Sequence, residues 1–76
     1  MEHIGQNIKK LRTAKNITQE QLANSLHISN QAVSKWEKEQ AYPDIALLPM
    51  IADYFSVSMD ELFGYRPDYL TYKERF

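Results

Sequence analysis

The stretch Ile28-Ser-Asn-Gln-Ala-Val-Ser-Lys-Trp-Glu37 decides the fold of this chain. Polar side chains in it and directly after it recur at the spacing of one side of an α-helix: Asn30, Gln31, Ser34, Lys35 and Lys38. Apolar side chains fall on the other side: Ala32, Val33 and Trp36. The stretch therefore predicts a helix with one buried and one outward face. The outward face carries amide, hydroxyl and ammonium groups, which can read base edges in a DNA major groove.

The residues before this helix predict a second helix that crosses it steeply. Thr18-Gln-Glu-Gln21 has the pattern of a capping box, and apolar residues follow it at helical spacing. Ser29 is a good N-cap for the next helix. Only Leu26-His-Ile28 separates the two helices, which is too short for antiparallel packing. This spacing favours a helix-turn-helix.

Three further helices complete the expected architecture. Ile4, Ile8 and Leu11 predict a first helix over about residues 4–15, whose opposite face is basic. Pro43-Asp44 suits the start of a fourth helix, with an apolar stripe at Ile45, Leu48, Ile51, Ala52 and Phe55. Because Pro49 lacks an N–H donor, we expect its regular part to begin around residues 45–47, after a looser turn. Ser58-Met-Asp-Glu61 predicts a short fifth helix that stops at Gly64. The expected class is all-α, with five short helices and no convincing strand.

Length and composition exclude several classes of protein. A chain of 76 residues with 43 % apolar residues makes one small globular domain. It has no cysteine, and its two histidines, His3 and His27, are too far apart for a metal cluster. The longest apolar stretch, residues 45–52, is too short to span a membrane, and the N-terminus lacks the features of a signal peptide. We therefore expect a soluble cytoplasmic protein with no metal, no cofactor and no membrane partner.

The net charge of −1 conceals a polarised chain. Residues 1–38 carry six lysines and arginines against three glutamates, which gives +3, whereas residues 39–76 carry three against seven acids, which gives −4. A polyanion would be attracted to the first half and repelled by the second. Charge runs of this kind are also common on solvated helix faces, so charge alone does not decide the function.

Five separated blocks carry a resemblance to a known family. They are Gln19-Glu-Gln-Leu-Ala23, Leu26-His-Ile-Ser29, Gln31-Ala-Val-Ser-Lys-Trp-Glu37, Tyr42-Pro-Asp44 and Val57-Ser-Met-Asp-Glu-Leu62. In order and spacing the chain resembles the phage repressor and Cro type of helix-turn-helix domain, the XRE family, over about residues 4–64. The resemblance implies a lambda-repressor-like domain whose third helix enters the major groove of double-stranded DNA, usually as a homodimer on a two-fold symmetric site.

The resemblance also implies which residues meet the DNA. The candidate base-reading residues are Asn30, Gln31, Ser34 and Lys35, with Gln31 the strongest because a Gln can bond adenine bidentately, while Lys suits guanine. The candidate phosphate-binding residues are Thr18, Gln19, Ser29, Lys38 and Tyr42. The alternative for each is an ordinary solvated or capping residue. For Gln19 the helix N-terminus favours an anion in any case.

Other positions of the family pattern are expected to be structural. In similar proteins an arginine late in the first helix pairs with the glutamate that ends the third, and Arg12 and Glu37 stand at these positions. His27 and Glu39 stand where the family usually has glycine, so both sites are expected to need positive φ. Glu39 also lies beside the expected phosphate-facing loop, where a carboxylate would weaken affinity unless it points away.

The expected domain organisation is a DNA-binding domain over residues 1–64 and an aromatic extension over residues 65–76. Aromatic side chains in the extension follow helical spacing: Tyr65, Tyr69, Tyr72 and Phe76. They would form an additional helical segment that contacts a second copy, packs on the chain's own core, or leads into a further domain.

Together these features predict a nucleoid-associated transcriptional regulator, most often a repressor in such families, and no enzyme. The rival is an antitoxin or protein-interaction adaptor with the same fold.

Overall fold

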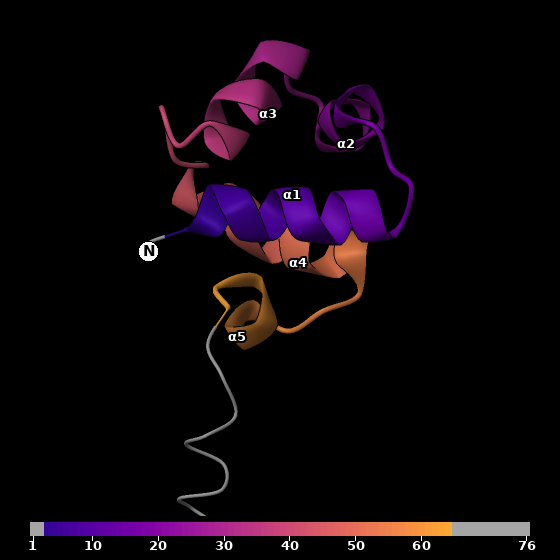
Figure 1. Cartoon of the computed structure of the whole chain (residues 1–76), viewed down its shortest axis with the longest axis vertical. Helices are drawn as coiled ribbons and strands as arrows, with labels where there is room; N and C mark the ends of the chain where they lie inside the picture. The colour runs from indigo at the N-terminus through magenta and orange to yellow at the C-terminus, as the bar shows by residue number, and fades with distance from the viewer. Residues whose placement is uncertain (1–2, 65–76) are drawn as a thin grey trace, which may run out of the picture.

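Five α-helices and one 3₁₀ turn form the part of the chain that the computed structural model describes, residues 3–64 (Figure 1). In chain order they are α1 (Ile4–Ala14), α2 (Gln19–Leu26), α3 (Asn30–Glu37), η1 (Ile45–Leu47), α4 (Leu48–Phe55) and α5 (Met59–Leu62). Residues 3–64 contain no strand, so the all-α prediction is confirmed. No helix in this range is long and apolar enough to cross a membrane. The predicted aromatic extension, residues 65–76, lies outside the described residues.

The helices bury one apolar core to which each of them contributes. In Figure 1, α2 and α3 lie on one side of α1, and α5 lies on the other. The buried apolar side chains are Ile4, Ile8, Leu22, Ala23, Leu26, Val33, Trp36, Leu48, Ile51, Ala52, Phe55 and Leu62. Trp36 is therefore a core residue, as its spacing predicts. Since α3 buries Val33 and Trp36, its opposite side must face outward.

The turn between α2 and α3 is closed by a residue in the left-handed conformation. His27 has φ 59°, and the N–H of Ile28 donates to the carbonyl of Ala23 at 3.0 Å. This 6→1 bond is typical of a Schellman motif, which usually places glycine at the left-handed position. The positive φ predicted for His27 is confirmed. The same holds at the end of α3, where Glu39 has φ 59° and Gln40 N–H donates to the carbonyl of Lys35 at 2.9 Å.

Hydroxyl side chains begin three of the helices, as the sequence predicts. Thr18 accepts from the N–H of Gln21 at 3.0 Å, and the Gln21 side chain accepts in return from the N–H of Thr18. Ser29 accepts from the N–H of Ala32 at 3.1 Å at the start of α3. Ser58 forms a second capping box that begins α5. These caps fix the first turns of α2 and α3.

The start of α4 differs from the prediction. The regular helix begins at Leu48, and residues 45–47 form the 3₁₀ turn instead. Pro49 explains the shift, because a proline without an N–H is tolerated only in the first turn of an α-helix. Ile45 was expected in the buried stripe, but it lies before the regular helix and is 77 % exposed. The other four stripe residues are buried: Leu48, Ile51, Ala52 and Phe55.

A glycine allows α1 to approach the end of α3 closely. Gly5 is buried, and a Cβ atom at this position would overlap the carbonyl oxygen of Trp36. The N-terminal turn of α1 therefore supports the backbone of α3 directly. This contact sets the position of the helix that carries the polar face.

Candidate nucleic-acid interface

The outward face of α3 carries the predicted base-reading residues. Asn30, Gln31 and Lys35 are exposed, whereas Ser34 is partly buried. No salt bridge or side-chain hydrogen bond is present for Gln31 or Lys35 among residues 3–64, so their polar groups face solvent. The outward face therefore presents the amide of Gln31 and the ammonium group of Lys35, while the other side of α3 is buried in the core. Ser34 is placed less favourably for direct contact than its three neighbours.

The two cap hydroxyls lie at the N-termini of α2 and α3. Thr18 and Ser29 are both exposed, and each uses an oxygen lone pair to accept a backbone N–H. Their hydroxyl hydrogens are left to donate. The N-terminal end of an α-helix also carries partial positive charge and unpaired N–H groups. Both caps are thus placed where an anion such as a phosphate would be stabilised.

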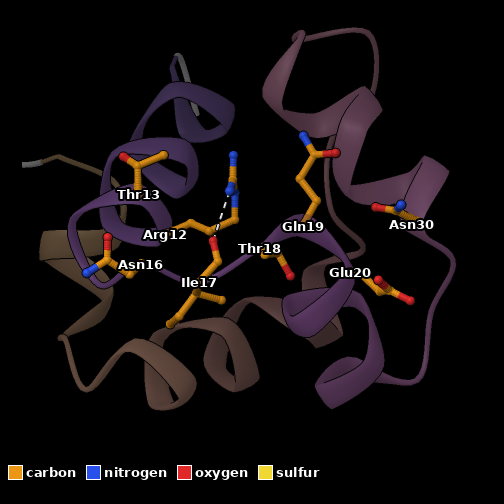
Figure 2. Close-up of a pocket in the computed structure, with 8 residues that line it drawn as sticks. All are labelled: Arg12, Thr13, Asn16, Ile17, Thr18, Gln19, Glu20 and Asn30. Atoms are coloured by element: carbon orange, nitrogen blue, oxygen red, sulfur yellow. Dashed lines mark hydrogen bonds between the residues drawn. The ribbon is translucent and has the colours of Figure 1, made fainter.

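An open hollow of about 620 Å³ joins the end of α1 to the starts of α2 and α3 (Figure 2). Its lining residues are Arg12, Thr13, Asn16, Ile17, Thr18, Gln19, Glu20 and Asn30. The structure thus gathers three predicted contact residues, Thr18, Gln19 and Asn30, around one polar surface. Thr13, Asn16 and Glu20 were not predicted there. Glu20 lies within the capping-box stretch, and Thr13 and Asn16 precede it, but this local pattern does not show how the end of α1 lies relative to α2.

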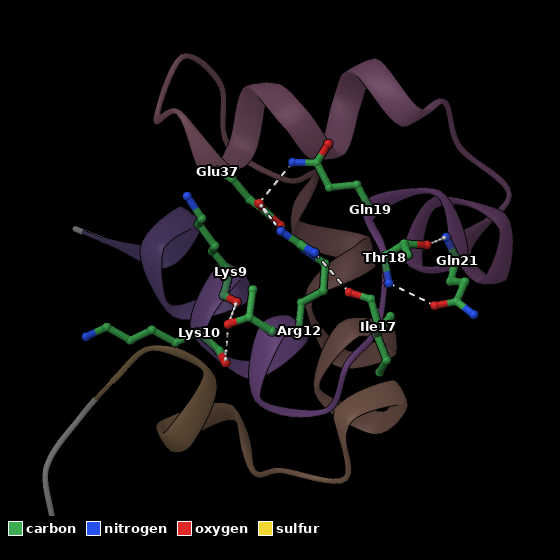
Figure 3. Close-up of polar contacts among 9 residues, drawn as sticks. Lys9, Lys10, Arg12, Ile17, Thr18, Gln19, Gln21 and Glu37 are labelled. Carbon is green, nitrogen blue, oxygen red and sulfur yellow. Dashed lines mark hydrogen bonds and ion pairs between the residues drawn. The ribbon is translucent and has the colours of Figure 1, made fainter.

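A hydrogen-bonded network behind this surface joins α1, α2 and α3 (Figure 3). Arg12 donates from Nε to Glu37 Oε2 at 2.7 Å and from its terminal nitrogen to Glu37 Oε1 at 2.9 Å. Its other terminal nitrogen donates to the carbonyl of Ile17 at 2.9 Å. The side chains of Arg12 and Glu37 are only 13 % and 3 % exposed. The hydrogen bond to Glu37 is the main reason that the pKa of Arg12 is raised, so the arginine stays charged.

Gln19 belongs to the same network, which the sequence did not predict. Its Nε2 donates to Glu37 Oε1 at 3.0 Å, and in Figure 3 its carbonyl oxygen points away from Glu37. One amide hydrogen is therefore used inside the domain, while the second remains for an outside acceptor. The backbone N–H groups of Gln19 and Glu20 also have no partner within α2. These N–H groups are donors that face the end of the helix.

The remaining predicted phosphate contacts lie at the opposite end of α3. Lys38 caps the helix and is exposed, and Tyr42 in the following loop is 61 % exposed. Lys38 comes nine positions after Ser29, on the far side of the eight-residue α3, which corresponds to a rise of about 13 Å along the helix. The candidate interface is thus elongated along α3 and does not form a single pocket. Between Lys38 and Tyr42, the Glu39 carboxylate accepts from Gln6 Nε2 at 3.2 Å and is directed at α1.

Comparison with known proteins identifies the domain type. A helix-turn-helix family model matches residues 8–62. Over 55 residues the chain is 51 % identical to the HTH-type transcriptional activator BcrR of Enterococcus faecalis, covering 72 % of this chain and 27 % of that protein. Over 61 residues it is 36 % identical to an HTH-type transcriptional regulator of Methanocaldococcus jannaschii, covering 80 % of this chain and 92 % of that one.

Comparison with solved structures also finds a transcriptional regulator with the same fold. A transcriptional regulator from Listeria innocua superposes with a TM-score of 0.76 at 30 % identity, covering 83 % of this chain and 59 % of that one. The chain thus spans about a quarter of BcrR and more than half of the Listeria protein. The matched region contains every element of the candidate interface.

Proposed function

Because this chain belongs to the XRE-type helix-turn-helix family, we propose that it is a sequence-specific DNA-binding domain of a transcriptional regulator. The observation that carries the proposal is the exposed polar face of α3 on a helix that is fixed from behind by Arg12, Glu37 and Gln19. A fixed helix can present the same donors and acceptors at every encounter, which sequence recognition requires.

We place α3 in the major groove of double-stranded DNA. Gln31 would bond the N6 and N7 atoms of an adenine, and Lys35 would donate to O6 and N7 of a guanine. Asn30, the first residue of α3, is an additional reader, and Ser34, which is partly exposed, would contribute its hydroxyl. The first-turn N–H groups of α2, with Thr18, Gln19 and Ser29, would hold the flanking phosphates on one side of the groove. Lys38 and Tyr42 would hold those on the other side.

The proposed mode of action is occupancy of an operator by a homodimer. Two copies related by a two-fold axis would place their α3 helices in successive major grooves of a symmetric site. Binding over a promoter would repress transcription by exclusion, which needs only the DNA-binding surface. The relative BcrR is named as a transcriptional activator, but this chain matches only about a quarter of its length.

Selection of binding sites from a random duplex pool tests this proposal. We expect a two-fold symmetric consensus and a measurable preference for it over random DNA. Gln31→Ala should then relax the preference at one base position by about 1–3 kcal/mol, whereas Gln19→Ala should weaken cognate and random DNA alike. Asn24→Ala, an exposed amide elsewhere on α2, is the matched control and should change neither quantity. Equal losses on cognate and random DNA for Gln31→Ala would refute the base-reading assignment.

A further inference from the structure

The helix α4 carries two apolar side chains, Met50 and Tyr54, that residues 3–64 cover only in part. Met50 is 47 % exposed and Tyr54 is 36 % exposed, although both belong to a helix that buries four other side chains. They are four residues apart and so lie on the same face of α4, one turn from each other. Asp53, also exposed, stands beside them on this face. We call Met50, Asp53 and Tyr54 the α4 surface.

We propose that the α4 surface is the docking site of residues 65–76 of the same chain, which cover it through their aromatic side chains. This segment follows Gly64 directly, and α5, which ends at Leu62, packs against α4. In Figure 1 the described part of the chain ends at α5, which lies below α4. Twelve residues reach up to about 40 Å when extended, whereas α4 is only about 12 Å long, so the tether reaches every part of the surface.

The composition of residues 65–76 complements the α4 surface. Tyr69, Tyr72 and Phe76 are spaced as one face of a helix, and aromatic rings pack well on a methionine sulfur and on a tyrosine ring. The segment also carries Arg66, Lys73 and Arg75 against two acids. Its net positive charge suits Asp53 on α4. Docking would thus bring apolar contact and opposite charge together at the α4 surface.

The size of the α4 surface favours the tethered segment over a second copy of the domain. Stable interfaces between separate proteins bury about 1,200–2,000 Å², far more than two partly exposed side chains supply. A tethered segment needs much less, because its effective concentration at the surface is on the order of millimolar. The homodimer of the proposed function would therefore use a different surface, and this inference does not depend on it.

Methionine methyl NMR of the full chain tests the inference, because Met50 reports directly on the α4 surface. Ring currents from the docked aromatics should displace the Met50 methyl signal, and Tyr72→Ser with Phe76→Ser should move it toward the position of a free methionine. The matched control is Thr71→Ala with Glu74→Ala, which changes the same segment off the aromatic stripe and should leave the Met50 signal in place. Met1, far from α4 in the sequence, is the internal reference.

Concentration distinguishes the segment of the same chain from that of a second copy. Docking within one chain requires that the Met50 signal of the unmodified protein stay unchanged on dilution. A signal that shifts on dilution would overturn the inference in favour of an intermolecular contact. A Met50 signal that is the same in the unmodified protein and in the Tyr72→Ser, Phe76→Ser variant would overturn it altogether. DNA binding by the same variants, measured in parallel, reports separately on the proposed function.

Discussion

At the residue scale, the carboxylate of Glu37 connects the three helices that carry the proposed interface. One of its oxygens accepts from Arg12 and Gln19, and the other accepts from Arg12 alone. A buried carboxylate is costly unless hydrogen bonds and a positive charge compensate it, and here both are present. Because Gln19 begins α2 and Glu37 ends α3, the same group sets the orientation of the proposed phosphate-binding end and of the reading helix.

Glu37→Gln tests this role. The substitution keeps the shape of the side chain but removes the negative charge opposite Arg12, which is only 13 % exposed. We expect the free energy of unfolding to fall by about 1.5–3 kcal/mol, the range of hydrogen bonds to charged groups. Urea denaturation measures the change, and Glu20→Gln, an exposed glutamate on α2, should alter it by less than about 0.5 kcal/mol. Similar losses for both variants would contradict a special role for Glu37.

The sequence reveals some of these residues and not others, for a physical reason. The polar face of α3 could be predicted because helical periodicity is a local property of the sequence. Arg12 and Glu37 could be paired only through the resemblance to a family. The bond from Gln19 to Glu37 joins residues that are 18 positions apart and depends on the crossing of two helices, which no local pattern encodes. The hollow beside Gln19 could not be predicted either, because it also depends on how the helices cross.

At the element scale, the helix ends of this chain use side-chain-bearing residues where glycine is usual. Within residues 3–64, Gly64 is the only glycine in a left-handed conformation, and His3 before α1 has φ 65°. Left-handed conformations with φ of 58–59° occur at Asn16, His27, Glu39 and Ser56. A left-handed conformation costs a residue with a Cβ atom roughly 1–2 kcal/mol, less for Asn. The domain therefore carries strain at several turns that a glycine would relieve.

His27→Gly should consequently stabilise the domain, although glycine is usually destabilising. Relief of the left-handed strain is offset in part by the larger entropy of glycine in the unfolded chain, about 0.5–1 kcal/mol. We expect a net gain of up to about 1 kcal/mol in the free energy of unfolding, measured by urea denaturation. Asn24→Gly, in the middle of α2, has negative-φ helical geometry and should instead lose a few tenths of a kcal/mol. A loss at His27 would show that its side chain contributes more than its backbone costs.

Gly5→Ala should instead lower the free energy of unfolding. The added methyl group would overlap the carbonyl oxygen of Trp36, so α1 and the end of α3 must move apart. Overpacking of this kind costs about 1–3 kcal/mol, and the movement should also lower DNA affinity because it tilts α3. Thermal unfolding and DNA titration measure the two effects. Lys10→Ala, an exposed change on the same helix, should leave the stability unaltered, and a Gly5→Ala variant as stable as the unmodified protein would contradict the close approach.

Element boundaries were predictable where a side chain itself makes the boundary. Thr18, Ser29 and Ser58 accept backbone hydrogen bonds from residues three positions later, so their roles can be read from the sequence. The start of α4 was misjudged because two signals compete there. The apolar stripe starts at Ile45, whereas Pro49 permits a regular helix only from Leu48.

At the scale of the whole molecule, the charges are separated between helices. All six lysines and arginines of residues 3–64 precede residue 39 and lie on or directly after α1 and α3. Of the acids in this range, Glu20 and Glu37 lie on α2 and α3, whereas Asp53, Asp60 and Glu61 lie on α4 and α5, which carry no lysine or arginine. A nearly neutral protein can thus approach DNA with one preferred orientation. The salt dependence of binding would distinguish the proposed function from that of a protein-interaction adaptor. Binding to phosphates releases counterions and weakens steeply with salt, while an apolar protein interface does not.

The position of a lysine, more than the total charge, should determine how DNA affinity responds to salt. Lys38 directly follows the C-terminal end of α3, where the proposed function places a phosphate contact. Lys10 extends from α1 on the side away from Gln19 (Figure 3). Lys38→Ala should reduce the slope of log K against log salt by about 1 and weaken cognate and random DNA equally. Lys10→Ala removes the same charge and should leave the slope unchanged. If both variants lowered the slope equally, general attraction between the basic half of the molecule and DNA would explain the binding, and a phosphate contact at Lys38 would not be needed.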